Sequence, residues 1–179
     1  MGHGGPRVTG AAATVELIRL APELDGALLD DRAYLAALRE GRWSDAAARV
    51  HAVVGRSVPP SSTAVTGASW EWYFAGDTAT KELVGSCAYK AAPDDDGVVE
   101  IAYFTYPQFE GRGYAKSMAR RLLELARRSG AVRRVVAHTL PVESASTHVL
   151  TAVGMGWAGE VTDQEDGPVW RWHLELGDR

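Results

Sequence analysis

The stretch that decides the fold is VVEIAYFTYPQFEGRGYAK, residues 98–116. Its first part, 98–106, is rich in β-branched and aromatic residues and predicts a buried strand. Gly111 and Gly113 follow, and apolar residues then recur at helical spacing up to residue 129, which predicts a long amphipathic helix. Glycines directly before a helix let backbone N–H groups converge near the positive end of the helix dipole. Such a turn is suited to bind a pyrophosphate, although spacing alone is equally typical of an ordinary tight turn.

The rest of the chain predicts one mixed α/β domain. Besides 98–106, strand-like runs occupy 14–20, 70–74, 82–90, 133–140, 157–162 and 169–176. Short turns between such runs favour antiparallel hairpins, one of them turning at Gly76-Asp77. Helical spacing also recurs between 22 and 58, where Ser44 is expected to cap the second of two helices, and at 144–153. Residues 1–12 are expected to form a flexible tail and residues 13–177 the domain.

Composition excludes several classes of protein. The 179 residues are 46% apolar and 23% charged, which is typical of a soluble globular domain. A net charge of −4 argues against nucleic-acid binding by bulk charge, and no apolar run approaches the roughly 18 residues of a membrane span. Cys87 is the single cysteine, so neither an internal disulfide nor a cysteine zinc site is expected. Residues 1–10 do not resemble a secretory signal, and a cytoplasmic protein without a metal is expected.

Two motifs resemble those of the GNAT-type N-acetyltransferases. The family's central motif, Gln/Arg-x-x-Gly-x-Gly/Ala, is matched in register by Gln108, Gly111 and Gly113. Its second signature, Pro-Glu-Asn-x-x-Ser-x-x-x-Leu-x-x-x-Gly-Phe, is matched by Pro141, Ser146, Leu150 and Gly154. The resemblance spans residues 14–176 and is closest to the branch that acetylates the N-termini of ribosomal proteins.

This resemblance implies a fold and an activity. The expected fold is one domain with a mostly antiparallel, twisted sheet of six or seven strands and helices on both faces. Only 98–106 and 133–140, the family's fourth and fifth strands, are expected to run parallel, splayed apart to admit acetyl-CoA. The implied activity is direct transfer of an acetyl group from acetyl-CoA to a primary amine in a ternary complex. The amine is left open among peptide N-termini, polyamines, aminoglycoside-like drugs and small metabolites, and a homodimer is compatible with the family.

The resemblance also implies the residues that bind acetyl-CoA, with its pyrophosphate over the glycine turn. They are Phe104, Thr105, Gln108, Gly111, Arg112, Gly113, Tyr114, Ala115 and Glu143. Glu143 stands where the family's second signature has Asn. Many members carry a tyrosine on the last helix that protonates the departing thiolate, but 144–153 has none. Ser146 is therefore the candidate near the sulfur, the alternative being a hydroxyl bonded back to its own helix.

A general base is useful because amines are largely protonated at pH 7. Glu100, at the beginning of its strand, matches a catalytic glutamate of some relatives, and the alternative is an outward-facing carboxylate paired with a neighbour. A backbone N–H around Phe104 is expected to polarise the thioester oxygen. His138 and His148 are expected to be structural or surface residues rather than catalytic ones. Cys87 is expected in the core.

Other interpretations remain open. Trp70, Trp72 and Tyr73 are expected either to line an acceptor pocket or to belong to the core. A second function is a catalytically lapsed acyl-CoA-binding or regulatory domain of the same fold. A dinucleotide-binding module is a weaker prediction, because its glycines should lie near the start of the chain and not past its middle.

Overall fold

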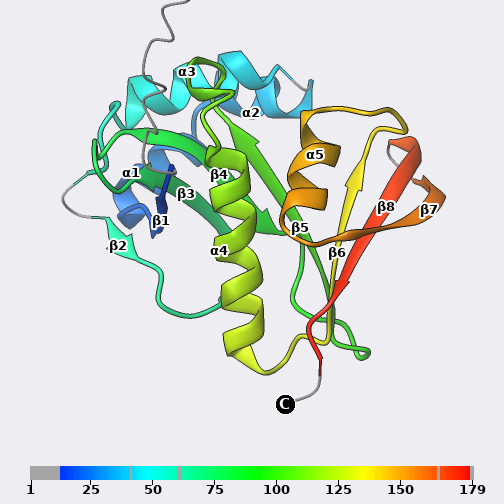
Figure 1. Ribbon diagram of the computed structural model, residues 1–179. Helices are drawn as coiled ribbons and strands as arrows, with labels where there is room; N and C mark the ends of the chain where they lie inside the picture. Colours follow the sequence, from blue (N-terminus) through cyan, green and yellow to red (C-terminus); the bar gives the residue numbers. More distant parts are fainter. Residues whose placement is uncertain (1–12, 41, 60–61, 165, 178–179) are drawn as a thin grey trace, which may run out of the picture.

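Strands and helices follow one another along the chain in an α/β order. The computed structural model describes residues 13–40, 42–59, 62–164 and 166–177, so the expected tail at 1–12 lies outside the described residues. The elements are β1 (Val15–Arg19), α1 (Pro22–Leu29), α2 (Arg32–Arg39), α3 (Trp43–Val53), β2 (Thr63–Ala64), β3 (Trp72–Asp77), β4 (Leu83–Tyr89), β5 (Val98–Thr105), η1 (Pro107–Phe109), α4 (Tyr114–Ser129), β6 (Arg134–Thr139), α5 (Ala145–Ala152), β7 (Gly156–Asp163) and β8 (Gly167–Glu175) (Figure 1).

One sheet contains all the strands of the described residues, in the order β2-β1-β3-β4-β5-β6-β8-β7. Within these residues every pairing is antiparallel except that of β5 with β6, so the expected mixed sheet is confirmed. The sheet has eight strands and not seven, because Thr63 and Ala64 add a short edge strand to β1. Two residues are too few to form a recognisable alternating pattern.

The two parallel strands separate soon after they meet. Their pairing joins Val98–Glu100 of β5 to Arg134–Val136 of β6, and the remaining residues of β5 pair only with β4. In Figure 1 the two strands diverge toward the end of the sheet at which α5 lies. The expected splay is therefore present, and it begins immediately after Glu100.

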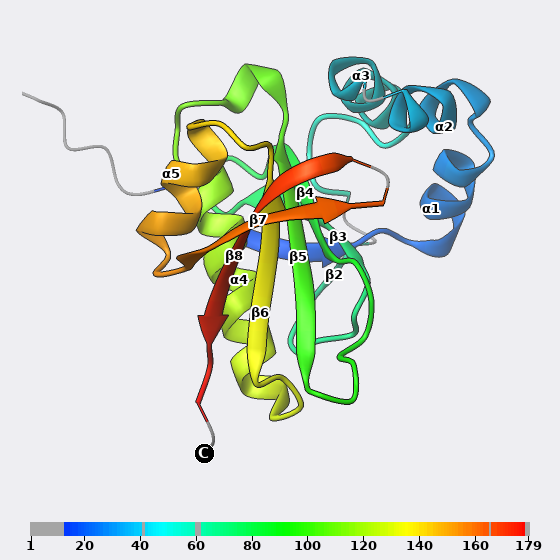
Figure 2. The same cartoon turned by 90° about the vertical axis from the view of Figure 1, so that its right-hand side faces the viewer.

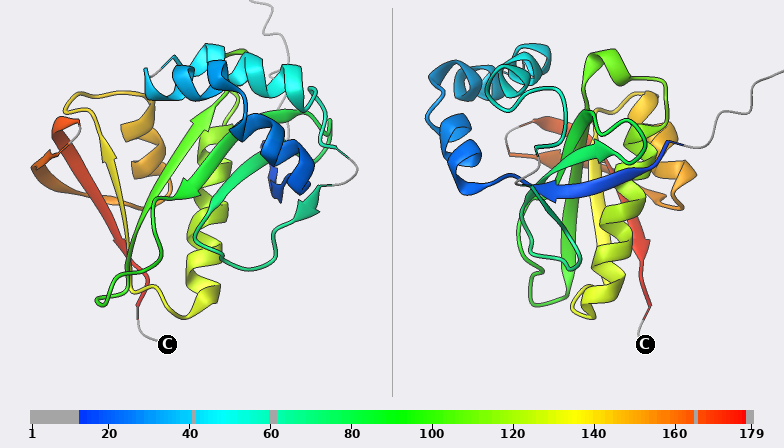
Figure 3. Two further views of the ribbon diagram at one scale, coloured as in Figure 1. Left: turned by 180° about the vertical axis from the view of Figure 1, so that it is seen from behind. Right: turned by 90° about the vertical axis from the view of Figure 1, so that its left-hand side faces the viewer.

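Helices cover both sides of the sheet, as expected (Figure 3). On one side, α4 packs its apolar stripe over β4, β5 and β1, with Met118, Leu122 and Leu125 fully buried. The hydroxyl of Tyr89 in β4 donates to the backbone oxygen of Leu122, which fixes the helix to the sheet. On the other side, α1–α3 form a small helical layer (Figure 2).

The helical layer differs from the sequence prediction in its boundaries. Three helices occupy 22–53 where two were expected, and α3 begins at Trp43 with Arg42 as its N-cap. Ser44 therefore lies inside the helix, and its prediction as the cap was wrong. Arg42 forms ion pairs with Glu40 (2.8 Å) and Asp45, which stabilise the earlier start. A good capping residue predicts that a helix starts nearby, but it does not fix the first residue of that helix.

The first hairpin also turns later than expected. β3 runs from Trp72 to Asp77, so Gly76 and Asp77 belong to the strand and the turn lies at 78–81. Asp77 causes this shift, because its side chain accepts hydrogen bonds from the backbone N–H groups of Ala79 (2.8 Å) and Thr80 (2.6 Å). The carboxylate thereby closes the turn from the strand end.

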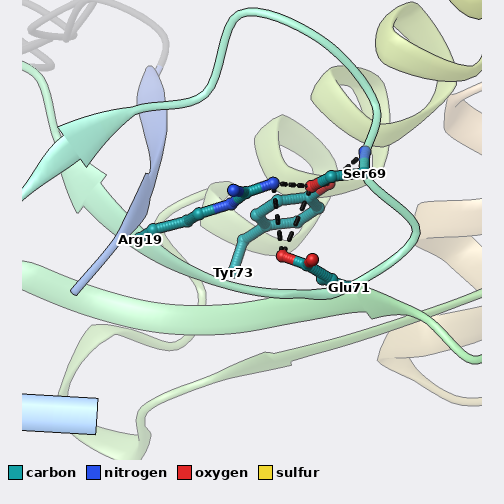
Figure 4. A network of polar contacts seen from close by, with 4 residues as sticks. All are labelled: Arg19, Ser69, Glu71 and Tyr73. Carbon is teal, nitrogen blue, oxygen red and sulfur yellow. Dashed lines mark hydrogen bonds and ion pairs between the residues drawn. The ribbon is translucent and has the colours of Figure 1, made fainter. Parts of the chain in front are cut away.

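A polar network holds the entrance to β3 (Figure 4). Arg19 of β1 lies 3.2 Å from a carboxylate oxygen of Glu71 and also contacts Ser69. The backbone N–H of Ser69 donates to the hydroxyl of Tyr73 (3.0 Å). Between these residues the backbone of Trp70 takes a positive φ of 47°. The network thus joins the end of β1 to the segment that presents Trp72.

Within the described ranges, no helix combines the length and the apolar character needed to cross a bilayer.

Candidate active site

The turn between β5 and α4 leaves open space above its glycines. Gly111 and Gly113 have φ values of 72° and 88°, which favour glycine. A Cβ atom built on Gly111 would meet nothing within 4 Å, and one on Gly113 would meet only Ala13 at 3.9 Å. No side chain caps α4, and its first turn carries no acidic residue. With basic Arg112 and Lys116 beside it, this helix start is suited to an anion.

Tyr114 anchors the beginning of α4 to the sheet. Its hydroxyl donates to Asp77 of β3 at 2.8 Å, and both side chains are buried. Burial tends to raise the pKa of Asp77, but the hydrogen bonds from Thr80, Tyr114 and Ala79 outweigh it and hold that pKa below its usual range. Burial, together with the bond to Asp77, raises the pKa of Tyr114 to about 12. The Tyr114 side chain is thus engaged in positioning the turn, which leaves its backbone for a ligand.

A first cavity of about 500 Å³, here called the turn cavity, extends from this turn to α5. Its lining consists of Tyr103, Phe104, Thr105, Phe109, Glu110, Gly111, Gly113, Tyr114, Ala115, Lys116, Ala145, Ser146 and Val149. The hydroxyl oxygen of Thr105 is buried and has no hydrogen-bond partner among the described residues. A buried hydroxyl without a partner is uncommon, and Thr105 is among the residues that line the turn cavity.

A second cavity, the strand cavity, lies between the diverging strands and has a volume of about 510 Å³. Its polar lining includes Lys90, Glu100, His138, Ser144, Ser146 and Asp166. A third space of about 250 Å³, the aromatic hollow, is lined by Trp72, Ser86, Cys87, Ala102, Tyr103 and Phe104. Tyr103 lines all three spaces, and Ser146 lines the turn cavity and the strand cavity.

The side chain of Tyr103 reaches from β5 to α5. Its hydroxyl donates to the backbone oxygen of Ser146 at 3.3 Å. Burial raises the pKa of Tyr103 well above its usual range, so the hydroxyl keeps its proton. Sequence analysis missed this residue, because its position is decided by where the two strands separate.

The backbone of β5 presents alternate residues to the opening. Lys90 donates its N–H to the oxygen of Glu100, and Tyr106 donates its N–H to the oxygen of Val84, so the even-numbered residues bond toward β4. The N–H groups of Tyr103 and Thr105 therefore turn toward the opening. The N–H of Phe104 itself turns toward β4, because antiparallel pairing alternates residue by residue, so the donors around Phe104 that face the opening belong to its two neighbours.

Glu100 has two cationic or potentially cationic neighbours. Its Oε1 atom lies 2.6 Å from Nζ of Lys90 and 3.0 Å from Nδ1 of His138. Both expectations for Glu100 therefore describe part of its surroundings: the carboxylate is paired, and it also lines the strand cavity. Sequence analysis missed Lys90, although the hairpin that joins β4 to β5 puts it beside Glu100.

Several expected residues lie away from the turn cavity. The amide nitrogen of Gln108 lies 3.5 Å from Nδ1 of His51 in α3, and its side chain lines a separate hollow there. Arg112 is exposed, with its guanidinium 5.6 Å from the centre of the Phe109 ring. Glu143 is exposed and lines neither the turn cavity nor the strand cavity.

The hydroxyl of Ser146 is not bonded back to its helix in the described structure. The neighbouring hydroxyls of Thr147 and Thr151 do bond back, to Ser144 at 2.9 Å and to Thr147 at 3.0 Å. Ser144 and Thr147 form a capping box that fixes the start of α5. Ser146 is therefore presented to both cavities by a well-defined helix end.

The remaining candidates divide between core and surface. Tyr73 and Cys87 are buried, and burial raises the pKa of the Cys87 thiol far above its usual range. Trp72 is 43% exposed and lines the aromatic hollow, and His148 is exposed on α5. Trp70 packs partly buried against Tyr89, with ring centres 5.0 Å apart. No group of three or more His, Cys, Asp or Glu residues in the described part of the chain could hold a metal ion.

Solved structures with a similar fold are acetyltransferases by their descriptions. A spermidine N-acetyltransferase chimera from Vibrio cholerae and the human enzyme matches with a TM-score of 0.53 at 15% identity, over 59% of this chain and 66% of that one. A ribosomal-protein-S5-alanine acetyltransferase from Vibrio fischeri matches with 0.53 at 15%, over 60% and 62%. The self-immunity acetyltransferase for microcin C7, solved with acetyl-CoA and AMP, matches with 0.52 at 16%, over 58% and 59%. The matched part thus spans slightly less than two thirds of these chains.

Sequence comparison adds the family. None of the curated proteins matches the chain. The profile of the acetyltransferase (GNAT) domain, however, matches residues 24–156, which is more than half of the sequence. The expected superfamily is confirmed, and the expected ribosomal-protein branch is represented among the similar structures. The splayed parallel strands and the open glycine turn are therefore features of a chain that belongs to the GNAT acetyltransferase family.

Proposed function

We propose that this protein transfers an acetyl group from acetyl-CoA to a primary amine, with both substrates bound at once. The observation that carries the proposal is the opening between β5 and β6, which leads from the glycine turn to Glu100 and His138. One end of this opening is suited to an anionic group and the other holds groups that exchange protons.

The turn cavity is the proposed site of the acetyl-CoA molecule. The N–H groups at the start of α4 and the open space above Gly111 and Gly113 suit its pyrophosphate. The unpartnered hydroxyl of Thr105 and the outward backbone groups of Tyr103 supply further polar contacts. Gln108, Arg112 and Glu143, also expected there, are proposed as peripheral contacts at most, because their side chains do not line the cavity.

The chemistry divides among groups around Tyr103. Bound acetyl-CoA supplies the acetyl group as a thioester. The N–H groups of Tyr103 and Thr105 are directed to donate to a thioester oxygen in the opening. Ser146 is placed where its hydroxyl can give a proton to a thiolate. Two atoms on the strand-cavity side can accept the proton of the amine, namely an oxygen of Glu100 and the ring nitrogen Nε2 of His138.

The acceptor amine is proposed to enter from the face opposite α4, through the aromatic hollow and the strand cavity. Both spaces share Ala102 and Tyr103 as walls. Trp72 at the rim offers an apolar and aromatic surface, and the nearby carboxylate of Asp166 suits a cationic amine. Similar structures are described as acting on spermidine and on a ribosomal protein, so both a polyamine and a peptide N-terminus belong in the first screen.

The experiment is an amine screen that measures free CoA. The protein is incubated with acetyl-CoA and one amine at a time, and the acetylated amine is identified by mass spectrometry. We expect release of CoA that depends on the amine, and a melting temperature raised by acetyl-CoA alone. A lapsed binding domain gives the raised melting temperature but no CoA release with any amine. Absence of both effects contradicts the proposal.

A further inference from the structure

A carboxylate and an imidazole meet where the opening between β5 and β6 begins. Glu100 is the last residue of β5 that pairs with β6, and His138 lies two residues beyond its partner Val136. Nδ1 of His138 lies 3.0 Å from Oε1 of Glu100, and the two side chains are 18% and 22% exposed. His138 thus reaches further into the open part of the cleft, toward Tyr103 and Ser146.

The Nδ1 atom of His138 has a single polar neighbour in the described part of the chain. It is buried, lies 3.0 Å from Oε1 of Glu100 and makes no aligned hydrogen bond in this conformation. A hydrogen on Nδ1 is stabilised by that carboxylate, and a neutral imidazole with a hydrogen on Nδ1 has Nε2 as its acceptor. The exposed part of the ring does not include Nδ1, and the residue lines the strand cavity.

Glu100 itself is less free to receive an amine. The ammonium of Lys90, 2.6 Å from Oε1, occupies the same oxygen that faces His138. An incoming ammonium that approached Glu100 would meet the like charge of Lys90 at short range. Since Nδ1 of His138 faces Glu100, Nε2 lies on the far side of the ring, and an amine that meets Nε2 is separated from this ion pair by the imidazole. The two partners of Glu100 therefore favour the imidazole as the group that meets the acceptor.

We propose that His138 is the catalytic residue that accepts the amine proton and that Glu100 is a positioning residue that keeps a hydrogen on Nδ1. This inference rests on the proposed acetyl transfer. The amine lone pair forms the C–N bond, and the C–S bond breaks with its electron pair on sulfur. An acceptor that arrives as an ammonium first loses one proton through Nε2 to solvent, which frees the lone pair. After the C–N bond forms, a second proton passes from nitrogen to Nε2. The sulfur takes a proton from the hydroxyl of Ser146, which recovers it from Nε2, so that the imidazole ends neutral. In between, the carboxylate stabilises the imidazolium.

Charged groups of several elements surround this imidazole and bear on its pH response. They are Glu100 of β5, Lys90 after β4, Asp166 between β7 and β8, and Arg171 and His173 of β8. From α5 and the residue before it, Ser144 and Ser146 contribute only hydroxyl groups to the lining. These charges act on the imidazolium that forms when the imidazole accepts a proton.

The kinetic test compares His138→Gln with Glu100→Gln, using an amine that the screen identifies. We expect His138→Gln to lower kcat about 10²- to 10⁴-fold at neutral pH. Glu100→Gln should lose less, and the double variant should match His138→Gln, because residues that act as a unit are not additive. Added imidazole should restore part of the activity of His138→Ala. His148→Gln, the same change on the exposed face of α5, should leave kcat unchanged.

A second test needs neither substrate nor turnover. Nitrogen-15 ring shifts report which nitrogen of a histidine carries the hydrogen, and the signals of His138 are those missing in His138→Gln. We expect the hydrogen on Nδ1 in the wild-type protein and in Glu100→Asp, and a mixture of tautomers in Glu100→Gln. Acetyl-CoA should still raise the melting temperature of each variant, which shows that it is folded.

Three results overturn the inference. One is a loss of kcat in Glu100→Gln as large as that in His138→Gln, and another is a wild-type rate in His138→Gln. The third is a ring hydrogen on Nε2 of His138 in the wild-type protein. Failure of the proposed function differs from all three: the wild-type protein then releases no CoA with any amine, which overturns both proposals together.

Discussion

The two ends of the cleft are built in different ways. The turn cavity owes its anion-binding end to one continuous stretch, 105–116, in which a strand, two left-handed glycines and a helix follow one another. The cluster of Lys90, Glu100 and His138 comes from β5, β6 and the residue that follows β4, which meet only in the folded sheet. The first end is therefore fixed by local conformation, whereas the second depends on register. Substitutions at the two ends should therefore affect binding, stability and rate differently.

The largest effect is expected at the local end. Gly113→Val should abolish acetyl-CoA binding, because a branched side chain fills the open space above the turn. Gly130→Val is the matched control: Gly130 also has a positive φ, 68°, but ends the same helix at its far end. Both variants carry a similar backbone strain of about 1–2 kcal/mol. Calorimetric titration should therefore find no binding for the first and wild-type affinity for the second.

A folded Gly113→Val protein with unchanged affinity would falsify the assignment of the turn. Equal losses in both variants would instead indicate that backbone strain, and not the lost space, removes binding.

The next effect tests whether the turn also depends on a contact with a strand that is distant in sequence. Tyr114→Phe removes the 2.8 Å bond to Asp77, and a hydrogen bond to a charged group contributes about 1.5–3 kcal/mol. Unfolding in urea should show a loss of stability of that size. Tyr106→Phe is the control, because the buried hydroxyl of Tyr106 has no partner among the described residues. That change should leave stability equal or raise it.

The Asp77–Tyr114 contribution should depend on pH at both extremes. The pKa of Asp77 is lowered from 3.8, so its stabilisation is present above that value and is lost as pH falls through the lowered pKa. The pKa of Tyr114 is raised from 10.0 to about 12, so its stabilisation is present below 10.0 and is lost as pH rises through 12. The difference in unfolding free energy between wild type and Tyr114→Phe should therefore be largest between these limits. A difference that is the same at all pH values contradicts the pairing.

A smaller effect is expected at Ser146, one of the residues that the turn cavity and the strand cavity share. Ser146→Ala removes the hydroxyl proposed to protonate the thiolate and should lower kcat, by about tenfold if water replaces it in part. KM for acetyl-CoA should stay close to the wild-type value. Thr151→Ala, on the same helix but with its hydroxyl bonded to the backbone of Thr147, is the control. Equal rates for the two variants would assign Ser146 to structure.

The smallest effect is expected at the rim of the turn. Arg112 is exposed, so its contribution to binding a phosphate should be of the order of 0.2–1 kcal/mol, as for other exposed ion pairs. Arg112→Ala should weaken acetyl-CoA binding at low salt, and the loss should shrink as salt is added. Arg127→Ala changes the net charge equally at the far end of α4 and should have no effect. A loss independent of salt would point to the packing of Arg112 on Phe109.

Sequence analysis predicted the parts of the cleft that depend on neighbouring residues. The strand before the turn, both glycines and the long helix follow from spacing and residue type, and so do the hairpins. Positions set by tertiary pairing were not accessible in that way. Gln108 is adjacent in sequence to the turn, yet η1 directs its side chain to His51 of α3. The N–H of Phe104 turns away from the opening because of its pairing with β4, which no motif records.

The charged cluster shows the same limit of prediction from sequence. Glu100 was identified because it matches a catalytic glutamate of some relatives. Its partner His138 was not, because the two side chains meet only where β5 pairs with β6. The parallel register of β5 and β6 is set across α4, and no local turn fixes it. A sequence can thus point to the carboxylate but not to the imidazole that it holds.

The short contact between β5 and β6 also determines how the sheet exchanges with solvent. Three residue pairs join a five-stranded ladder, ending at β5, to a three-stranded ladder that begins at β6. The amides of Tyr103 and Thr105 lie beyond this seam, so their hydrogens should exchange with deuterium far faster than those of Val99. A molecule lodged in the seam takes the place of the missing pairing and should slow that exchange. It should also hold the two ladders together during unfolding, so that the protein opens as one cooperative unit where the free chain opens as two.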